Sequence, residues 1–274
     1  MGKIRRTRAP VLTVSVVIAG LAFGFIAAPA AAQDHVVDQS SSSNADSIQE
    51  AIDNASSGDT IEVRAGTYNE SVTVNKSLTL RGAGADSTTI VGAGESAQGE
   101  SQPFAAIHVN DENGPVRNVT IEGFSVRNPD GTFGIFAGTG TTNGESDGIS
   151  GLVIRNNVVR DISTNSSGGS LTGGPAGIGI RADYGTDGNP GIEIRDNTVS
   201  NVRSDGSSNA NGITLKSFTG EAGFGKDSGG NDAIDPSSPP ATDTDVVGND
   251  ISNIDAGDGS GRHIAKGISV SGQF

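Results

Sequence analysis

Six basic residues occupy equivalent positions in neighbouring copies of an internal repeat. The pairs are Arg155 with Arg195, Arg127 with Arg160, and Arg181 with Lys216. If the copies stack as parallel strands, the side chains of each pair lie about 4.8 Å apart. Like charges at that spacing are unfavourable unless carboxylates or an anionic ligand lie nearby. We therefore predict a surface salt-bridge ladder in which Glu122 and Glu193 compensate the cations; the alternative is a face, including Glu193, that binds acidic polysaccharide.

The repeat itself is a short apolar strand, a two-residue step rich in Asn, Asp or Gly, and a second strand. Its four copies align at Phe124, Asn157, Asn197 and Asn249, and again at Asn128, Asp161, Asn201 and Asn253. A second family of strands interleaves with them, namely AIHV from 106, GIFA from 134, GIGI from 177, GITL from 212 and GISV from 267. Because the irregular spacing is confined to the loops between strands, the pattern indicates a solenoid of β-coils.

Side-chain alternation assigns the faces of these strands. Ile192 and Ile194 are predicted to fill the core while Glu193 points outward. The chain must then turn within one or two residues, and Asn, Asp and Gly tolerate the left-handed backbone that such a turn needs. Stacked Asn side chains can also hydrogen-bond to one another. We therefore interpret the recurring Asn as structural rather than catalytic.

One segment is predicted to be helical, SIQEAIDNA at 47–55. Ser47 is the expected N-cap, and Glu50 is its capping-box partner three residues later. Ile48, Ala51, Ile52 and Ala55 fall on one face of this helix.

Residues 47–92, SIQEAIDNASSGDTIEVRAGTYNESVTVNKSLTLRGAGADSTTIVG, resemble the opening of right-handed parallel β-helix proteins of the pectin-lyase-like superfamily. The combination of GDTI-x-V, the G-T-Y-x-E step at 66–70 and SLTLRGAG carries the likeness, and the later repeats extend it over most of 45–274. The resemblance implies an all-β fold: one right-handed parallel β-helix of about six coils with a short N-terminal α-helix capping the open core. We expect this domain to span 46–274, after a flexible segment at 33–45, and to be truncated at its C-terminal end, because the chain stops just after a strand that should begin another coil.

The enzymes of that superfamily carry recognisable motifs. The polygalacturonase strings NTD, DD, GHG and RIK do not occur in this sequence, and no pectate-lyase-like carboxylate cluster or Ser-His-Asp arrangement is evident. We therefore predict a non-catalytic protein that presents a face to glycans or envelope components. A polysaccharide lyase or glycoside hydrolase is the first alternative, and an accessory factor for metal-centre maturation is the second.

Metal and aromatic chemistry is sparse in the sequence. The chain has no Cys, and His35, His108 and His263 form no ligand-spaced cluster. Two Asp-rich loops are calcium candidates through clustered oxygens, with Asp255 and Asp258 in one and Asp227 and Asp232 in the other; the alternative is that both are solvated loops. Phe136 is the one aromatic residue that we predict to face out from a strand.

The first 32 residues have the layout of an export signal, with four basic residues, an apolar run from Val11 to Ala28 and small residues before a cleavage point after Ala32. An uncleaved anchor helix is the alternative. Cleavage leaves 14 basic residues against 32 acidic residues, a net charge of −18, which argues against nucleic acid as a partner and is typical of proteins from salt-loving microbes. We thus predict an extracellular or cell-surface protein that does not span a membrane. It has Asn-x-Ser/Thr glycosylation acceptors at Asn54, Asn69, Asn75, Asn118 and Asn165.

Overall fold

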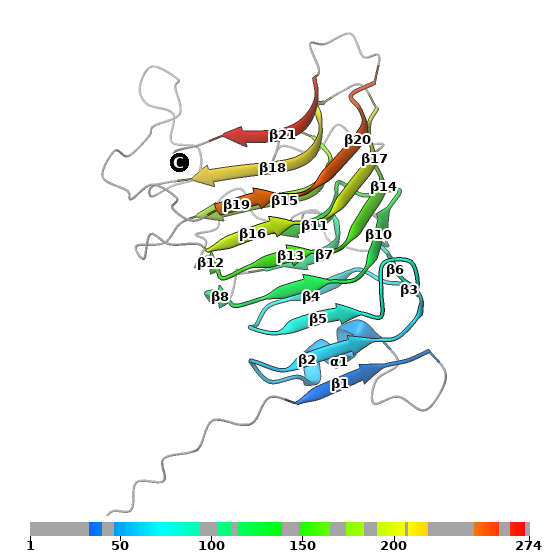
Figure 1. Ribbon diagram of the computed structural model, residues 1–274, viewed down its shortest axis with the longest axis vertical. Coiled ribbons are helices and arrows are strands. Elements are labelled where there is room, and N and C mark those ends of the chain that lie inside the picture. The colour runs from blue at the N-terminus through cyan, green and yellow to red at the C-terminus, as the bar shows by residue number, and fades with distance from the viewer. Residues whose placement is uncertain are drawn as a thin grey trace, which may run out of the picture. The chain divides into compact units, whose positions relative to one another are not determined.

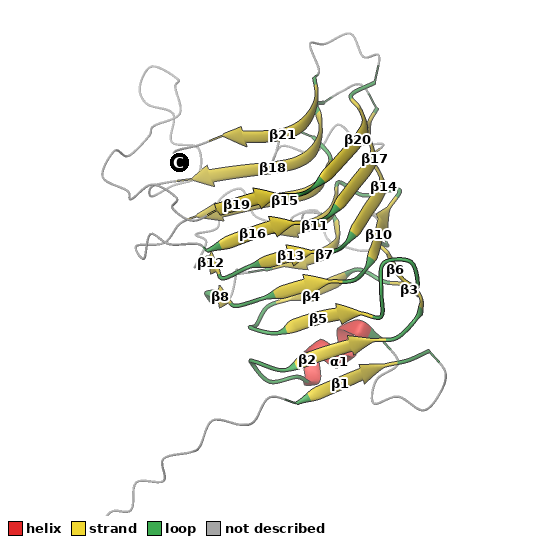
Figure 2. Ribbon diagram, in the orientation of Figure 1, coloured by secondary structure: helices red, strands yellow, loops and turns green. Residues whose placement is uncertain are grey.

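The structure, a computed structural model, describes residues 33–39, 47–93, 104–110, 114–138, 148–164, 174–183, 191–205, 208–218, 244–257 and 264–271. These residues belong to one compact unit. They form a right-handed parallel β-helix in which successive coils stack along one axis (Figure 1), so the predicted fold is confirmed. Strands make up most of this part of the chain, with one short helix near its start (Figure 2).

Three parallel sheets, which we call A, B and C, form the sides of the solenoid. Sheet A contains β1 (Asp34–Val37), β2 (Thr60–Val63), β5 (Thr79–Gly82), β9 (Thr120–Glu122), β13 (Val153–Arg155), β16 (Ile192–Arg195) and β19 (Thr244–Val247). Sheet B contains β3 (Gly66–Asn69), β6 (Thr88–Val91), β10 (Ser125–Asn128), β14 (Val158–Thr164), β17 (Thr198–Ser204) and β20 (Asp250–Asp255). Sheet C contains β4 (Val72–Val74), β7 (Ala105–Val109), β11 (Phe133–Ala137), β15 (Ala176–Asp183), β18 (Ala210–Phe218) and β21 (Ala265–Ser271). A small fourth sheet pairs β8 (Val116–Arg117) with β12 (Ile149–Ser150).

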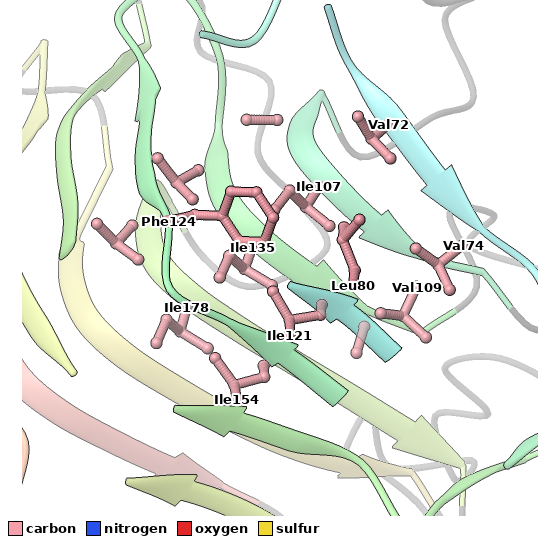
Figure 3. Close-up of a cluster of buried hydrophobic side chains, with 14 of the residues drawn as sticks. Val72, Val74, Leu80, Ile107, Val109, Ile121, Phe124, Ile135, Ile154 and Ile178 are labelled. Carbon is pink, nitrogen blue, oxygen red and sulfur yellow. The ribbon is translucent and has the colours of Figure 1, made fainter. Parts of the chain in front are cut away.

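The core is a stack of apolar layers, one from each coil. The predicted inward residues Ile192 and Ile194 are fully buried, whereas Glu193 faces outward. Inward residues lie beside their counterparts in the next coil, as Ile154 lies beside Ile194. Side chains of sheets A and C meet around Phe124 (Figure 3), and sheet B adds residues such as Val126 and Val159 to the same cluster. Continuous burial of this kind supplies most of the stability of a solenoid.

A buried asparagine ladder turns the chain from sheet A to sheet B. Asn157 Nδ2 donates to Asn197 Oδ1 at 3.1 Å, and Asn197 Nδ2 donates to Asn249 Oδ1 at 3.0 Å. The side-chain oxygens also accept main-chain N–H groups from the preceding coil. Phe124 donates to Asn157 Oδ1 at 3.1 Å, Asn157 donates to Asn197 Oδ1 at 3.1 Å, and Asn197 donates to Asn249 Oδ1 at 3.0 Å. The residue before each of these four is Gly, Asn or Asp with positive φ. The predicted stacking and its structural role are therefore confirmed.

A second row of three residues lies on the outside of sheet B. Asp161, Asn201 and Asn253 have φ of 56°, 55° and 51° and form a bulge, because the pairing of β14, β17 and β20 skips all three. Their side chains are linked by hydrogen bonds from Asn253 to Asn201 and from Asn201 to Asp161. The prediction that Asn128 belongs to this row is wrong: Asn128 pairs with Ile162, one residue past the bulge, and is fully buried with Nδ2 bonded to two carbonyl oxygens.

Glycine recurs at the start of the sheet C strands because two coils approach closely there. A Cβ on Gly177 would lie 2.3 Å from Val199 Cγ1 and 2.9 Å from the Gly212 carbonyl oxygen. A Cβ on Gly134 or Gly212 would likewise lie too close to a β-branched side chain of sheet B and to the carbonyl oxygen of the equivalent glycine in the next coil. The repeated Gly-Ile dipeptide is thus explained by packing rather than by chemistry.

The helix α1 (Ile48–Asn54) covers the first coil as predicted. The side chain of Ser47 accepts the Glu50 N–H, and Ile48, Ala51 and Ile52 are buried. The motif residue Glu70 caps the same end, since its two carboxylate oxygens accept the N–H groups of Ile48 and Gln49 at 3.0 and 3.1 Å. None of the helices in the described segments is long and apolar enough to cross a membrane.

The strand β1 corrects the expectation of a flexible segment at 33–45 for its first residues, whereas 40–46 lie outside the described residues. Asp34–Val37 pairs in parallel with Thr60–Val63 and forms the first strand of sheet A. Val37 is fully buried, and the Tyr68 hydroxyl donates to the carbonyl of Arg64 at 3.0 Å beside it. The residues that carry the family resemblance, among them Asp59, Tyr68 and Glu70, therefore build the closed end of the solenoid.

Candidate functional site

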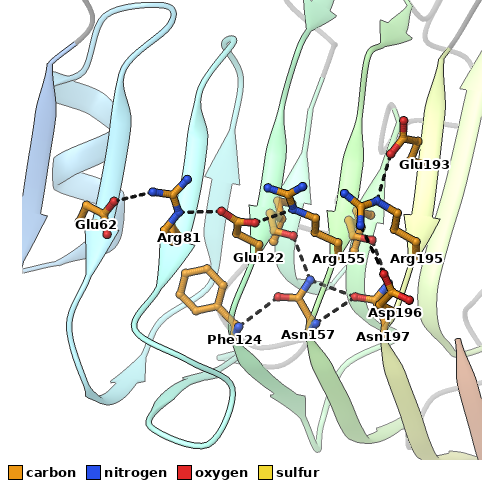
Figure 4. A network of polar contacts seen from close by, with 12 residues as sticks. Glu62, Arg81, Glu122, Phe124, Arg155, Asn157, Glu193, Arg195, Asp196 and Asn197 are labelled. Carbon is orange, nitrogen blue, oxygen red and sulfur yellow. Dashed lines mark hydrogen bonds and ion pairs between the residues drawn. The ribbon is translucent and has the colours of Figure 1, made fainter. Parts of the chain in front are cut away.

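Charged residues form a continuous row on the outer face of sheet A (Figure 4). We call Glu62, Arg81, Glu122, Arg155 and Arg195, which pair in register from strand to strand, the sheet A charge row. Arg81 contacts Glu62 at 3.0 Å and Glu122 at 2.6 Å, and Arg155 contacts the other oxygen of Glu122 at 2.6 Å. Arg155 and Arg195 are neighbours, as the sequence predicts.

Glu122 holds the centre of this row. Its side chain is 13% exposed, and this burial raises the carboxyl pKa, but the hydrogen bonds and charges of Arg155 and Arg81 outweigh burial and leave the pKa below its ordinary value. Glu122 therefore remains charged while it separates two guanidinium groups.

Arg195 has carboxylates of its own. Its guanidinium contacts Glu193 at 3.2 Å and Asp196 at 3.3 Å. Four carboxylates thus accompany three guanidiniums along the row, which is the geometry of the predicted salt-bridge ladder. A ligand-binding role for Arg155, Arg195 and Glu193 stays a prediction, and the row has no excess of positive charge to attract an anion.

A different balance holds on sheet B, where Arg127 and Arg160 are direct neighbours in register. Arg127 Nε and Arg160 Nη1 both contact Asp161 Oδ2 at 2.9 Å, while Asn201 donates to Asp161 Oδ1 at 2.9 Å. Partial burial raises the pKa of Asp161, but the hydrogen bond from Asn201 and the two guanidinium charges together lower it below its ordinary value. Asp161 is therefore ionised at neutral pH, where it holds both arginines.

One carboxylate serves both of these guanidiniums. We call Arg127 and Arg160 the sheet B arginine pair; their side chains are 39% and 40% exposed. Within the described part of the chain, no second carboxylate contacts either guanidinium, and each uses one nitrogen toward Asp161. Because a guanidinium has five N–H donors, the pair keeps a local excess of one positive charge and several exposed donors.

Sheet C does not present the third predicted pair. Arg181 and Lys216 are neighbours in register, but Arg181 is 3% exposed, so the expectation that it faces an open groove is wrong. The side chain of Lys216 lies outside the described residues. Arg181 shares its burial with the rest of the outer face of sheet C from β7 to β18, where Phe136 and Thr214 are also inaccessible to solvent.

The same burial corrects the prediction for Phe136. Its ring lies on the outer side of sheet C but packs against Phe133 and His108, with ring centroids 4.7 and 5.5 Å apart. His108 is buried beside it and its Nε2 lies 2.8 Å from the Gly138 carbonyl oxygen. Burial lowers the pKa of His108 to about 4, and the carbonyl can only accept, so His108 is neutral with its proton on Nε2. Phe136 is thus no exposed sugar platform.

Of the four candidate calcium ligands, the structure describes Asp255. Asp255 contacts Arg203 Nη2 at 3.0 Å and accepts the N–H of Gly257 at 2.9 Å. Asp227, Asp232 and Asp258 lie outside the described residues, as does the whole of the 223–232 loop. Across the segments that are described, no three His, Cys, Asp or Glu side chains are grouped to hold a metal ion. Calcium binding stays a prediction.

Four of the five predicted glycosylation acceptors, Asn54, Asn69, Asn75 and Asn118, are exposed, and Asn165 lies outside the described residues. Sequence reasoning missed Arg81 and Glu62 in the sheet A charge row and Asp161 as the partner of the arginine pair. A signal for the first two exists, because the strings TIEV, TLRG, TIEG, VIRN and EIRD all place a charge directly after the inward aliphatic residue.

No protein-family model and no curated protein sequence matches this chain. Among solved structures it is similar to pectin methylesterase from carrot, at 14% identity over 87% of this chain and 88% of that one, with a TM-score of 0.37. It is also similar to pectin methylesterase PemA from Erwinia chrysanthemi, at 13% identity over 85% and 92% with a TM-score of 0.37, and to an alginate lyase from Paenibacillus, at 18% identity over 81% and 76% with a TM-score of 0.31. The fold assignment above rests on the strand order and register of this chain itself.

Proposed function

We propose that this chain is an exported, non-catalytic β-helix protein that binds acidic polysaccharide through the sheet B arginine pair. The observation that carries the proposal is the single carboxylate, Asp161, that Arg127 and Arg160 share. On the sheet A charge row, by contrast, every guanidinium is matched by carboxylates. Of these two groups of arginines, the pair on sheet B is therefore the more favourable place for an anion.

The chemistry of the pair favours planar, multi-oxygen anions. Two guanidiniums about one strand spacing apart offer parallel N–H donors, and such donors bind carboxylate or sulfate oxygens in a forked geometry. Uronic acids and sulfated sugars carry those groups at regular intervals along a chain. The exposed glycosylation acceptors and the predicted leader support an extracellular or cell-envelope setting for this ligand.

The large negative charge of the protein gives this binding an unusual salt dependence. A mature chain of net charge −18 repels a polyanion over the Debye length, which is about 30 Å at 0.01 M salt and about 8 Å at 0.15 M. The forked contacts act over a few ångströms and are screened much less. We therefore expect tighter binding at about 0.15 M salt than at about 0.01 M, the reverse of binding driven by a basic surface.

The test compares an acidic polysaccharide, such as alginate or pectate, with neutral dextran by calorimetry. Wild-type protein should bind the acidic polymer, and the double substitution R127Q/R160Q should weaken binding at least about tenfold, since each charge-assisted hydrogen bond contributes about 1.5–3 kcal/mol. R203Q is the matched control, because Arg203 lies on the same sheet but already pairs with Asp255. Equal affinity in the double variant and the wild type, or no binding of either polymer, would refute the proposal.

The alternative function is a polysaccharide lyase or glycoside hydrolase. This alternative rests on the likeness of residues 47–92 to the pectin-lyase-like superfamily. Incubation with the same polymers distinguishes the two functions: new unsaturated or reducing ends would assign the enzyme, and their absence would leave binding alone.

A further inference from the structure

Asp59 is a buried carboxylate at the N-terminal end of the solenoid. It is 3% exposed and lies just before β2. Its Oδ2 accepts the Ser56 N–H at 2.7 Å and lies 3.0 Å from His35 Nε2, and its Oδ1 accepts the main-chain nitrogen of Gln33 at 2.8 Å. The hydrogen bonds from Gln33 and Ser56 lower the pKa of Asp59 against the opposing effect of burial, so the buried group carries a full negative charge.

The third donor, Gln33, is the residue that follows the predicted cleavage point. The small residues Ala30 and Ala32 precede it in the A-x-A arrangement typical of signal-peptide cleavage, and β1 begins one residue later, at Asp34. We propose that removal of the leader converts the Gln33 nitrogen from an amide into an ammonium group that Asp59 binds as a buried ion pair, so that processing itself fastens β1 to the β-helix.

The strand β1 needs such a fastening because it is an edge strand. It pairs with β2 on one side only, yet it carries Val37, which is fully buried over the first core layer. Edge strands at chain ends fray when little holds them. An amide nitrogen gives Asp59 one neutral donor, whereas an ammonium group gives it three donors and a positive charge. Within the described segments, His35 is the other group that could bring positive charge to Asp59, and it does so only when protonated.

The ion pair has a defined pH signature. An α-amino group titrates at about 7.7–8.0 when free, and pairing with Asp59 raises that pKa in the folded state. The added stability is therefore fully present below the free value and is lost as pH rises through the raised one. The titratable groups that contact Asp59 in the described residues are this nitrogen and His35, and the loss at high pH separates the amine from the histidine.

The experiment compares a chain that begins at Gln33 with a chain that begins at Ala30, which retains three leader residues. At pH 6.5 the Gln33 chain should melt about 2–4 °C higher, the shift expected for about 1 kcal/mol in a domain of this size, and the difference should vanish near pH 10. Acetylation of the Gln33 amine should remove the difference as well. Equal melting temperatures of the free and acetylated chains at pH 6.5 would overturn the proposal.

A second measurement tests the ion pair in the unsubstituted chain. The acylation rate of the α-amine in the folded wild-type chain, followed against pH, should give a pKa above that of a Gln-Asp-His-Val peptide. Identical pKa values would overturn the proposal, as would conversion of Gln33 to pyroglutamate in the folded protein, since cyclisation requires the neutral amine and leaves no ammonium. These outcomes concern the N-terminal end alone, and the polysaccharide proposal is tested independently of them.

Discussion

Substitution of Asn197 by alanine should be among the most destabilising single changes in this β-helix. Asn197 is 1% exposed, and its Oδ1 accepts two donors of Asn157, the main-chain N–H and one side-chain N–H, both at 3.1 Å. Alanine leaves both donors buried without a partner. At about 1–3 kcal/mol for each orphaned group, the expected loss is about 2–6 kcal/mol, a large share of the stability of an ordinary domain.

Urea unfolding followed by circular dichroism measures this loss, and the exposed asparagine row supplies the matched control. Asn201 also stacks between neighbours and also donates to one of them, but water replaces its partners when it is removed. Asn201→Gly keeps the positive φ of 55° accessible, so it should cost about 1 kcal/mol or less. If N197A costs no more than N201G, the ladder does not stabilise the corner and the reasoning fails.

Two further predictions concern sheet C. His108, with a pKa of about 4 against an ordinary 6.5, binds fewer protons when folded, so its contribution to stability is present above pH 6.5 and is lost as pH falls toward 4. Wild-type protein should lose about 3 kcal/mol more than H108Q between pH 7 and pH 4 in urea titrations, and parallel losses in both proteins would contradict this. Gly177→Ala should destabilise by about 1–3 kcal/mol, because the new Cβ would lie 2.3 Å from Val199 Cγ1, whereas Gly267→Ala, at the same repeat position with nothing within 4 Å, should change the melting temperature little.

The repeats made the corners of the solenoid predictable from sequence. The positions of Asn157, Asn197 and Asn249 depend on local backbone preferences and on a repeat that is visible in the sequence. Aligning the repeats therefore predicted both the stacking of these residues and the pairing of Arg155 with Arg195. Asn128 was misplaced because an alignment without gaps cannot show that Asp161 is an inserted bulge residue. The inserted residue shifts the register by one, so the buried counterpart of Asn128 in the next coil is Ile162.

Burial on the outside of a sheet was the property that sequence could not supply. Arg181 alternates with inward residues just as Arg155 does, yet one is buried and the other is not. The difference depends on whether other parts of the protein cover each face, which the alternation of side chains along a strand does not determine. The strand β1 was missed for a related reason: Asp34–Val37 is too short to show a period, and its partner β2 alone explains why it is extended.

The regular stacking that makes asparagine useful in this fold also determines where a ligand can bind. Every outward side chain meets its counterpart about 4.8 Å above it, so a column of arginines is stable only if carboxylates stand within or beside it. Counting arginines therefore overestimates anion sites; the informative quantity is the number of guanidiniums minus the carboxylates they already contact. Along sheet A, Glu122, Glu193 and Asp196 leave no surplus for Arg155 and Arg195, whereas Asp161 alone faces two guanidiniums on sheet B. An anionic sugar has a reason to bind there that the longer and more conspicuous row does not provide.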